Sequence, residues 1–177
     1  MRAVFLDRDG TTIVDPPDLR VDKMEKLKLF EDTISALQAL AGLDYEVFLV
    51  TNQAGIAEGR LDGVEFKKIN DKFIEMVAES GVKIIKTYMC PHAEADGCDC
   101  KKPKPGMLLQ AAKDYDINLK NSWMIGDRQS DILAGVAAGT KTILVKTGNV
   151  PVVSAEATFT AATLTDAIKF ITSQSRD

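Results

Sequence analysis

Short apolar runs recur along the chain, and each one ends in a polar or glycine-containing segment. Runs of this length between turn-forming residues are typical of strands buried in a sheet. The expected strands are residues 3–6, 45–50, 84–89, 122–125 and 142–145, with a further edge strand at 157–159. The run at residues 3–6 is apolar throughout, which predicts a strand buried on both faces. It is too short to cross a membrane.

Between these runs, apolar residues recur three and four positions apart, which is the spacing of amphipathic helices. The expected helices lie near residues 33–41, 63–80, 105–115 and 132–138, with a final helix from residue 165 onward. We expect Asp32 to cap the first helix and Thr165 to cap the last. We also expect Leu109 to face the core.

The alternation of strands and helices predicts the fold class. It implies βαβ units, a mainly parallel sheet and right-handed crossovers, and therefore a doubly wound α/β fold. The chain shows no repeat, low-complexity tract or linker, so residues 1–177 are expected to form a single domain. Only residues 90–104 depart from the alternation.

The composition excludes several classes of protein. The 177 residues carry a formal net charge of −4, which gives no field that would hold nucleic acid or an anionic membrane. No stretch has the character of a membrane span and no secretory signal opens the chain, so we expect a cytoplasmic protein. Three cysteines, an odd number, argue against a disulfide framework.

Polar side chains follow three of the expected strands. They are Asp7 and Asp9, Thr51 and Asn52, and Asp127 and Asp131. In an open α/β sheet, ligands bind beyond the carboxyl ends of the strands. Mg²⁺ prefers oxygen ligands, and Asp7 and Asp127 would supply them if their strands are neighbours. Each pair alone fits an ordinary turn or strand cap, but three such ends together favour one shared site.

A group of lysines follows the third expected strand. Lys101, Lys102 and Lys104 could meet a phosphate, and Thr51 could offer it a hydroxyl. Phosphoryl transfer needs cations on the equatorial oxygens, and lysine is a common phosphate ligand. Without the neighbouring carboxylates, a solvated basic turn would be the simpler interpretation.

All three cysteines and the only histidine lie in residues 90–104, which we call the Cys/His loop. They are Cys90, His92, Cys98 and Cys100. A Cys₃His set is typical of tetrahedral zinc sites, and four protein ligands leave no open position, so the zinc would be structural. It would pin the loop and place the lysines that follow. Buried or adventitious thiols are the less favoured alternative.

Four segments together resemble the motifs of haloacid-dehalogenase-type phosphatases. They are residues 5–11, 50–55, 98–103 and 125–128. More narrowly, they resemble the branch that contains D,D-heptose 1,7-bisphosphate phosphatase and histidinol-phosphatase. The resemblance covers roughly residues 2–148, and the order of the motifs, together with the Cys/His loop, is specific for this branch.

The resemblance implies a Mg²⁺-dependent phosphoric monoester hydrolase. In such an enzyme Asp7 is the nucleophile that forms an aspartyl-phosphate, and Asp9 is first the general acid and then the base. Thr51 and Lys102 would stabilise the transferring phosphoryl group. Asp7, Asp127 and the main-chain carbonyl of Asp9 would hold Mg²⁺. Because Asp9 must be protonated for its first role, we expect its pKa to be raised.

The resemblance also implies that Asn52, Lys101 and Arg128 contact the substrate, a small phosphorylated molecule. The intervals between the motifs leave no room for a separate cap domain. An open site would therefore be shaped by residues 16–20 and by the Cys/His loop, in a protein that we expect to be monomeric.

Different features favour different substrates. Residues 105–109 and 146–148 resemble the heptose enzyme, whereas the short spacing between His92 and Cys98 and the segment 15–18 resemble the histidinol-phosphate enzyme. We favour heptose bisphosphate and keep histidinol phosphate as the alternative. A DNA 3′-phosphatase and a non-catalytic zinc module are further hypotheses. The acidic balance argues against the first, and the intact aspartates argue against the second.

Overall fold

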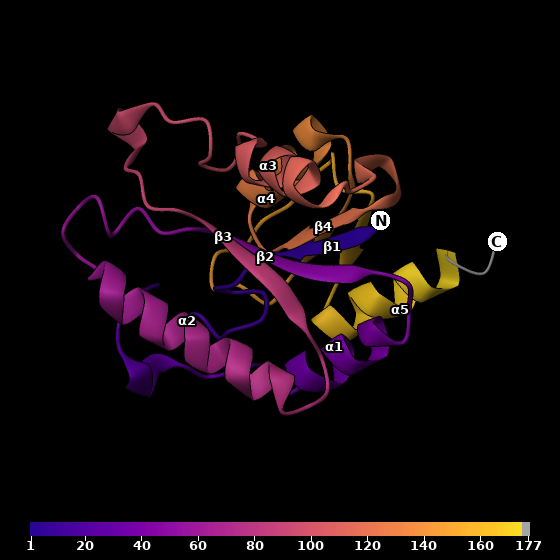
Figure 1. Ribbon diagram of the computed structural model, residues 1–177, viewed down its shortest axis with the longest axis horizontal. Helices are drawn as coiled ribbons and strands as arrows, with labels where there is room; N and C mark the ends of the chain where they lie inside the picture. The colour runs from indigo at the N-terminus through magenta and orange to yellow at the C-terminus, as the bar shows by residue number, and fades with distance from the viewer. Residues whose placement is uncertain (175–177) are drawn as a thin grey trace.

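The protein, described by a computed structural model over residues 1–174, is built on one six-stranded sheet (Figure 1). The strands run in the order β3-β2-β1-β4-β5-β6, and all neighbours are parallel. The strands are β1 (Ala3–Leu6), β2 (Glu46–Asn52), β3 (Ile84–Cys90), β4 (Trp123–Gly126), β5 (Lys141–Val145) and β6 (Phe159–Ala161). This topology confirms the predicted α/β fold.

Helices cover both faces of the sheet and give three layers. α1 (Thr33–Ala41), α2 (Gly63–Ala78) and α5 (Leu164–Gln174) lie on one face, and α3 (Gly106–Tyr115) and α4 (Gln129–Ala138) lie on the other (Figure 1). Short 3₁₀ turns occupy Met24–Lys26, Glu94–Asp96 and Leu119–Asn121. In this described part of the chain, no helix has the length and hydrophobicity that a membrane crossing requires.

The two helical layers explain why the central strands are continuous apolar runs. Every residue of β1 and β4 is buried, because helices cover both faces of these strands. One apolar cluster includes Leu37, Phe73 and Ile168, and the other includes Leu108 of α3. Full burial of one such side chain contributes about 2 kcal/mol to the stability of the fold. Because many of them pack against the sheet, the ends of its strands are held in fixed positions.

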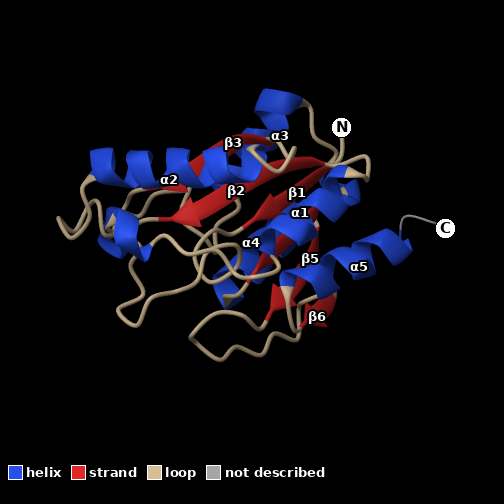
Figure 2. Cartoon of the chain, turned by 90° about the horizontal axis from the view of Figure 1, so that it is seen from below, coloured by secondary structure: helices blue, strands red, loops and turns tan. Residues whose placement is uncertain are grey.

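The sheet order places three polar strand ends side by side. β1 lies between β2 and β4, and Leu6 is in register with Leu49 on one side and with Ile125 on the other. The residues that follow these strands therefore emerge at one edge of the sheet, where the loops gather beyond the arrowheads (Figure 2). This confirms that the strands preceding Asp7 and Asp127 are neighbours.

Three details of the predicted elements are wrong. β6 begins at Phe159 rather than at residue 157, because Thr158 instead exchanges hydrogen bonds with Thr142 across to β5. α4 begins at Gln129 rather than at residue 132, because the Arg128 N–H donates to Asp131 and caps the helix there. Leu109 is 47% exposed, because α3 turns other residues inward.

The predicted caps are only partly correct. Asp32 occupies the N-cap position of α1, but its carboxylate accepts a 2.9 Å hydrogen bond from the Thr165 N–H of α5. α5 begins at Leu164, and the Thr163 hydroxyl, rather than that of Thr165, accepts from the Asp166 N–H at 3.2 Å. Asp32 therefore ties α1 to α5 instead of capping its own helix.

Candidate active site

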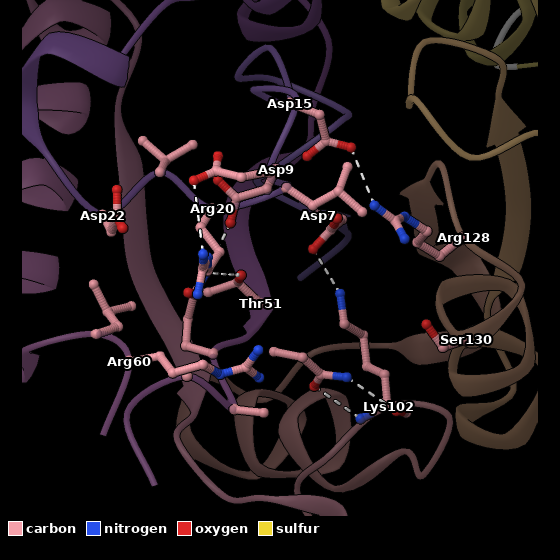
Figure 3. A pocket seen from close by; sticks show the side chains of 18 of the residues that line it. Asp7, Asp9, Asp15, Arg20, Asp22, Thr51, Arg60, Lys102, Arg128 and Ser130 are labelled. Atoms are coloured by element: carbon pink, nitrogen blue, oxygen red, sulfur yellow. Dashed lines mark hydrogen bonds and ion pairs between the residues drawn. The ribbon is translucent and has the colours of Figure 1, made fainter. Parts of the chain in front are cut away.

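A cavity of about 460 Å³ opens at the carboxyl ends of β1 and β2 (Figure 3). Seven residues that the sequence singles out line it: Asp7, Asp9, Thr51, Asn52, Lys102, Arg128 and Asp131. Four distant segments of the chain therefore contribute side chains to one hollow. The other residues that line the cavity include Asp15 and two cations, Arg20 and Arg60.

Asp7 and Lys102 form the centre of this site. Asp7 follows β1 directly, and its N–H donates to the Ile125 carbonyl of β4 at 2.9 Å. Lys102 Nζ donates to Asp7 Oδ1 at 2.7 Å and to the Val50 carbonyl at 2.8 Å. Burial opposes the charge of Lys102, but the carboxylates of Asp131 and Asp7 outweigh it and raise its pKa above the ordinary value. Lys102 is therefore a permanent cation beside Asp7.

Asp9 is held between two donors. Arg8 Nη1 lies 2.9 Å from Asp9 Oδ1, and Gln53 Nε2 donates to Asp9 Oδ2 at 2.7 Å. Burial raises the pKa of Asp9, with Arg8 opposing the shift and Asp7 adding to it. This is the direction expected of a group that must carry a proton before it can donate one.

Thr51 and Asn52 end β2 and have different surroundings. Thr51 is 1% exposed, and its Oγ1 accepts from Gln53 Nε2 at 2.9 Å. The Asn52 side chain exchanges two 3.0 Å hydrogen bonds with the main chain of Lys102, through both its amide nitrogen and its oxygen. Asn52 therefore positions Lys102, and its contact with substrate stays a prediction.

Asp127 directly follows β4 and is buried, and it is not among the residues that line the cavity. Thr11 Oγ1 donates to Asp127 Oδ1 at 3.2 Å, and Arg128 Nε donates to Asp127 Oδ2 at 2.9 Å. The other end of the Arg128 guanidinium donates to Asp15 at 3.1 Å. A methyl group at Gly148 would overlap Asp127 Oδ2, so only glycine leaves room for this carboxylate.

The carboxylates around Asp7 fit a divalent cation. Ligand oxygens of Asp7, Asp127 and Asp131 lie within 4.8 Å of one another, and all three residues are buried. Burial and the neighbouring charges of Asp7 and Asp131 raise the pKa of Asp127. Asp131 Oδ1 lies 2.6 Å from Lys102 Nζ but makes no hydrogen bond. A hard cation with oxygen ligands would relieve this crowding of negative charge.

Lys101 is the predicted substrate residue that lies apart from the others. It is not among the residues that line the cavity, and its Nζ pairs with Glu94 of the Cys/His loop at 3.1 Å. The main chain turns between Lys101 and Lys102, so the two neighbouring lysines have different partners. The predicted contact between Lys101 and the substrate has no support from this geometry.

The Cys/His loop brings its four predicted ligands together. His92 Nδ1 lies 3.2 Å from Cys100 Sγ, and Cys90 Sγ lies 3.0 Å from Cys100 Sγ and 3.6 Å from Cys98 Sγ. All four donor atoms lie within 4.8 Å of one another, and the cysteines form no disulfide. A tetrahedron with Zn–S bonds of about 2.3 Å has edges of about 3.8 Å, so the shortest of these separations would lengthen by about 0.8 Å around a bound ion. The cluster could therefore bind zinc.

Two further residues belong to the site without a role assigned from sequence. Asp131 lies in the first turn of α4 and pairs with Lys102. Gln53 donates to both Asp9 and Thr51. The signal for Gln53 is its spacing: residues two apart on an extended segment share a face, so Gln53 follows Thr51 toward the cavity. The signal for Asp131 is its place shortly after an expected strand, close to Asp127, although the sequence assigns it no role.

A family model described as HAD-hydrolase-like matches residues 99–168. A D-glycero-beta-D-manno-heptose-1,7-bisphosphate 7-phosphatase of Pasteurella multocida is 43% identical over 154 residues, which cover 83% of each chain. The D-glycero-alpha-D-manno-heptose-1,7-bisphosphate 7-phosphatase of Campylobacter jejuni is 39% identical, with 81% of each chain covered.

A solved structure has the same architecture. It is a D,D-heptose 1,7-bisphosphate phosphatase from B. bronchiseptica complexed with magnesium and phosphate, and it superposes with a TM-score of 0.90. Its sequence is 30% identical, and the match covers 98% of this chain and 99% of the other. The shared fold therefore extends over essentially the whole length of both proteins.

Proposed function

Since the chain belongs to the haloacid-dehalogenase-like phosphatases, in the branch of the D-glycero-D-manno-heptose-1,7-bisphosphate 7-phosphatases, we propose that it removes the 7-phosphate from this sugar bisphosphate. The observation that carries the proposal is the 2.7 Å hydrogen bond from Lys102 to Asp7, with Asp9 and Thr51 lining the same cavity. A carboxylate beside a fixed cation is suited to attack on a phosphoryl group.

The proposed reaction proceeds in two displacements. An oxygen of Asp7 forms a bond to phosphorus while the bond from phosphorus to the sugar oxygen breaks, and Asp9 gives its proton to that leaving oxygen. Asp9, now ionised, then takes a proton from water. The water oxygen bonds to phosphorus and releases Asp7 and inorganic phosphate. Each displacement is easier than direct hydrolysis by water.

Lys102 and Thr51 are proposed to bind the equatorial oxygens during both displacements. Lys102 already reaches Asp7, so its charge lies where the phosphoryl group would sit. Thr51 accepts from Gln53, which leaves its own hydroxyl hydrogen free for a phosphoryl oxygen. Both groups are buried, so their interaction with developing charge is strong.

Asp7, Asp127 and the main-chain carbonyl of Asp9 are the proposed Mg²⁺ ligands. The bound ion would neutralise charge on the phosphoryl oxygens. Thr11 and Arg128 hydrogen-bond to Asp127 and fix its orientation, as groups around a metal ligand commonly do. Asp131, which is not one of these proposed ligands, instead forms an ion pair with Lys102 at 2.6 Å.

The cavity lining supports a doubly phosphorylated substrate. A bisphosphate brings a second dianion that the catalytic groups do not neutralise. Arg20 and Arg60, which pair with Asp18 and Glu58, line the cavity on the side away from Arg128 (Figure 3). We propose that Arg128 contacts the substrate near the transferred phosphate, with Lys101 and Asn52 as weaker candidates.

We further propose that residues 1–177 act as a single phosphatase domain, monomeric and cytoplasmic, with no nucleic-acid partner. The formal net charge of −4 supports the last point. A zinc ion on Cys90, His92, Cys98 and Cys100 would be structural, because four protein ligands close its coordination shell.

Phosphate release tests the proposal. The purified protein with Mg²⁺ is assayed on heptose 1,7-bisphosphate, histidinol phosphate and a 3′-phosphorylated oligonucleotide. We expect kcat/KM for the bisphosphate to exceed that for the other two by about 100-fold. A preference for histidinol phosphate would contradict the proposed substrate and leave the phosphatase chemistry intact. Loss of turnover in Asp7→Asn is expected on every substrate.

A further inference from the structure

One amide nitrogen joins two residues of the proposed reaction. Gln53 Nε2 donates to Asp9 Oδ2 at 2.7 Å and to Thr51 Oγ1 at 2.9 Å. An amide nitrogen has two hydrogens, so both bonds can form at once. Gln53 thereby links the end of β1 to the end of β2 on the cavity side.

The position of Gln53 is fixed from its own main chain. Its N–H donates to the Cys90 carbonyl at the end of β3 at 2.7 Å. The side chain therefore starts from an anchored point and reaches Asp9 from one side. Arg8 Nη1 meets Asp9 from the other, 2.9 Å from Oδ1 and 3.1 Å from Oδ2. Arg8 is fully buried and its guanidinium lies over the Phe66 ring, so it cannot move with the substrate.

We propose that Gln53 is a positioning residue that holds the Asp9 carboxyl group where it can protonate the leaving oxygen. The inference rests on the proposed phosphatase function. Arg8 alone contacts both oxygens through a single nitrogen and leaves the carboxyl group free to rotate about that contact. The Gln53 bond to Oδ2 removes this freedom.

The effect of a misplaced Asp9 on the rate of ester cleavage depends on the leaving group. When the bond from phosphorus to the ester oxygen breaks, its electron pair passes to that oxygen. An alkoxide is strongly basic and needs the Asp9 proton, whereas an electron-poor phenolate leaves without one. A misplaced Asp9 therefore slows alkyl esters much more than aryl esters.

The test compares kcat/KM of Gln53→Met on heptose 1,7-bisphosphate and on p-nitrophenyl phosphate. This parameter reports steps up to departure of the leaving group, so later hydrolysis of the phosphoenzyme does not mask the difference. We expect a loss of about 30-fold on the sugar ester and of less than about threefold on the aryl ester. The matched control is Gln38→Met, since Gln38 is remote from the cavity and donates to the Ser80 carbonyl.

Two results would overturn the inference. Equal losses on both esters would place Gln53 in phosphate binding or in folding, and no loss on either would leave it without a role. In an Asp9→Asn background, Gln53→Met should cause no further loss on the sugar ester, because the group that it positions is already gone. A wild-type protein that hydrolyses neither ester would instead overturn the proposed function itself.

Discussion

Lys102 Nζ donates to Asp7 Oδ1 at 2.7 Å, although the two residues are 95 positions apart in sequence. The lysine arrives two residues after Cys100, and its main chain is held by Asn52. The Cys/His loop, the end of β2 and the end of β1 therefore meet at one ion pair. The conformation of the Cys/His loop therefore determines where the Lys102 ammonium group lies relative to Asp7.

Replacing Lys102 should affect both activity and stability. In Lys102→Met the phosphoryl charge loses its fixed cation, and we expect kcat to fall by about 100-fold or more. The same change leaves the buried carboxylates of Asp7 and Asp131 without their cationic partner, which should lower the free energy of unfolding by about 3 kcal/mol in metal-free buffer. Phosphate release and urea unfolding measure the two effects. Lys67→Met, at an exposed site on α2, is the control, and equal behaviour of the two variants would contradict this role.

Removal of zinc should loosen the loop that carries Lys102. We expect the purified protein to contain about one zinc ion per chain and Cys98→Ser to contain much less. The melting temperature of this variant should fall by about 10 °C, because metal binding free energy is part of the folding free energy of such loops. Metal analysis and calorimetry check both points. Chelated wild-type protein should regain activity with zinc and Mg²⁺ together, and full recovery with Mg²⁺ alone would contradict the assignment.

Much of this site could be predicted because its residues follow strands. Asp7, Thr51 and Asp127 each come directly at or after an apolar run, and the parallel sheet brings such ends to one edge. The spacing of cysteines and histidine was equally informative, since the four ligands lie within a short loop. In each case a local pattern was sufficient to locate the residue.

Other features depend on packing that no local pattern encodes. Asp32 occupies a cap position, but whether it caps its own helix or α5 depends on how the two helices meet. Lys101 and Lys102 are identical in type, and only the turn of the main chain sends one to Glu94 and the other to Asp7. Leu109 fits the helical spacing of a core residue but lies on the outer side of α3.

A methyl group at Gly148 should weaken Mg²⁺ binding. The added carbon would overlap Asp127 Oδ2 and Cγ, so this proposed ligand must move. We expect the Mg²⁺ concentration for half-maximal activity to rise by about tenfold in Gly148→Ala. The control is Gly63→Ala, where an added methyl group meets no atom within 4 Å. An unchanged Mg²⁺ dependence would remove Asp127 from the ligand set.

The Asp114 carboxylate should contribute to stability only above its folded-state pKa. Hydrogen bonds from Tyr88, Lys86 and Gln110 lower the pKa of Asp114 to about 2. The unfolded value is about 3.9, so the stabilisation is fully present above that pH and is lost as the pH falls toward 2. We expect Asp114→Asn to be less stable than wild type at pH 6, with the difference shrinking below pH 4. Urea unfolding of both proteins between pH 6 and pH 2 measures this difference in stability. A difference that does not change with pH would contradict the explanation.

The central claim is that Asp7 becomes phosphorylated, and mass spectrometry of trapped protein tests it most directly. In Asp9→Asn, p-nitrophenyl phosphate can still react because its leaving group needs no proton, but hydrolysis of the phosphoenzyme lacks its base. After a short reaction with Mg²⁺ and acid quenching, the account predicts one added phosphoryl group on the peptide that contains Asp7, and none in the Asp7→Asn, Asp9→Asn double variant. A phosphoryl group on another residue, or wild-type turnover by Asp7→Asn, would contradict it.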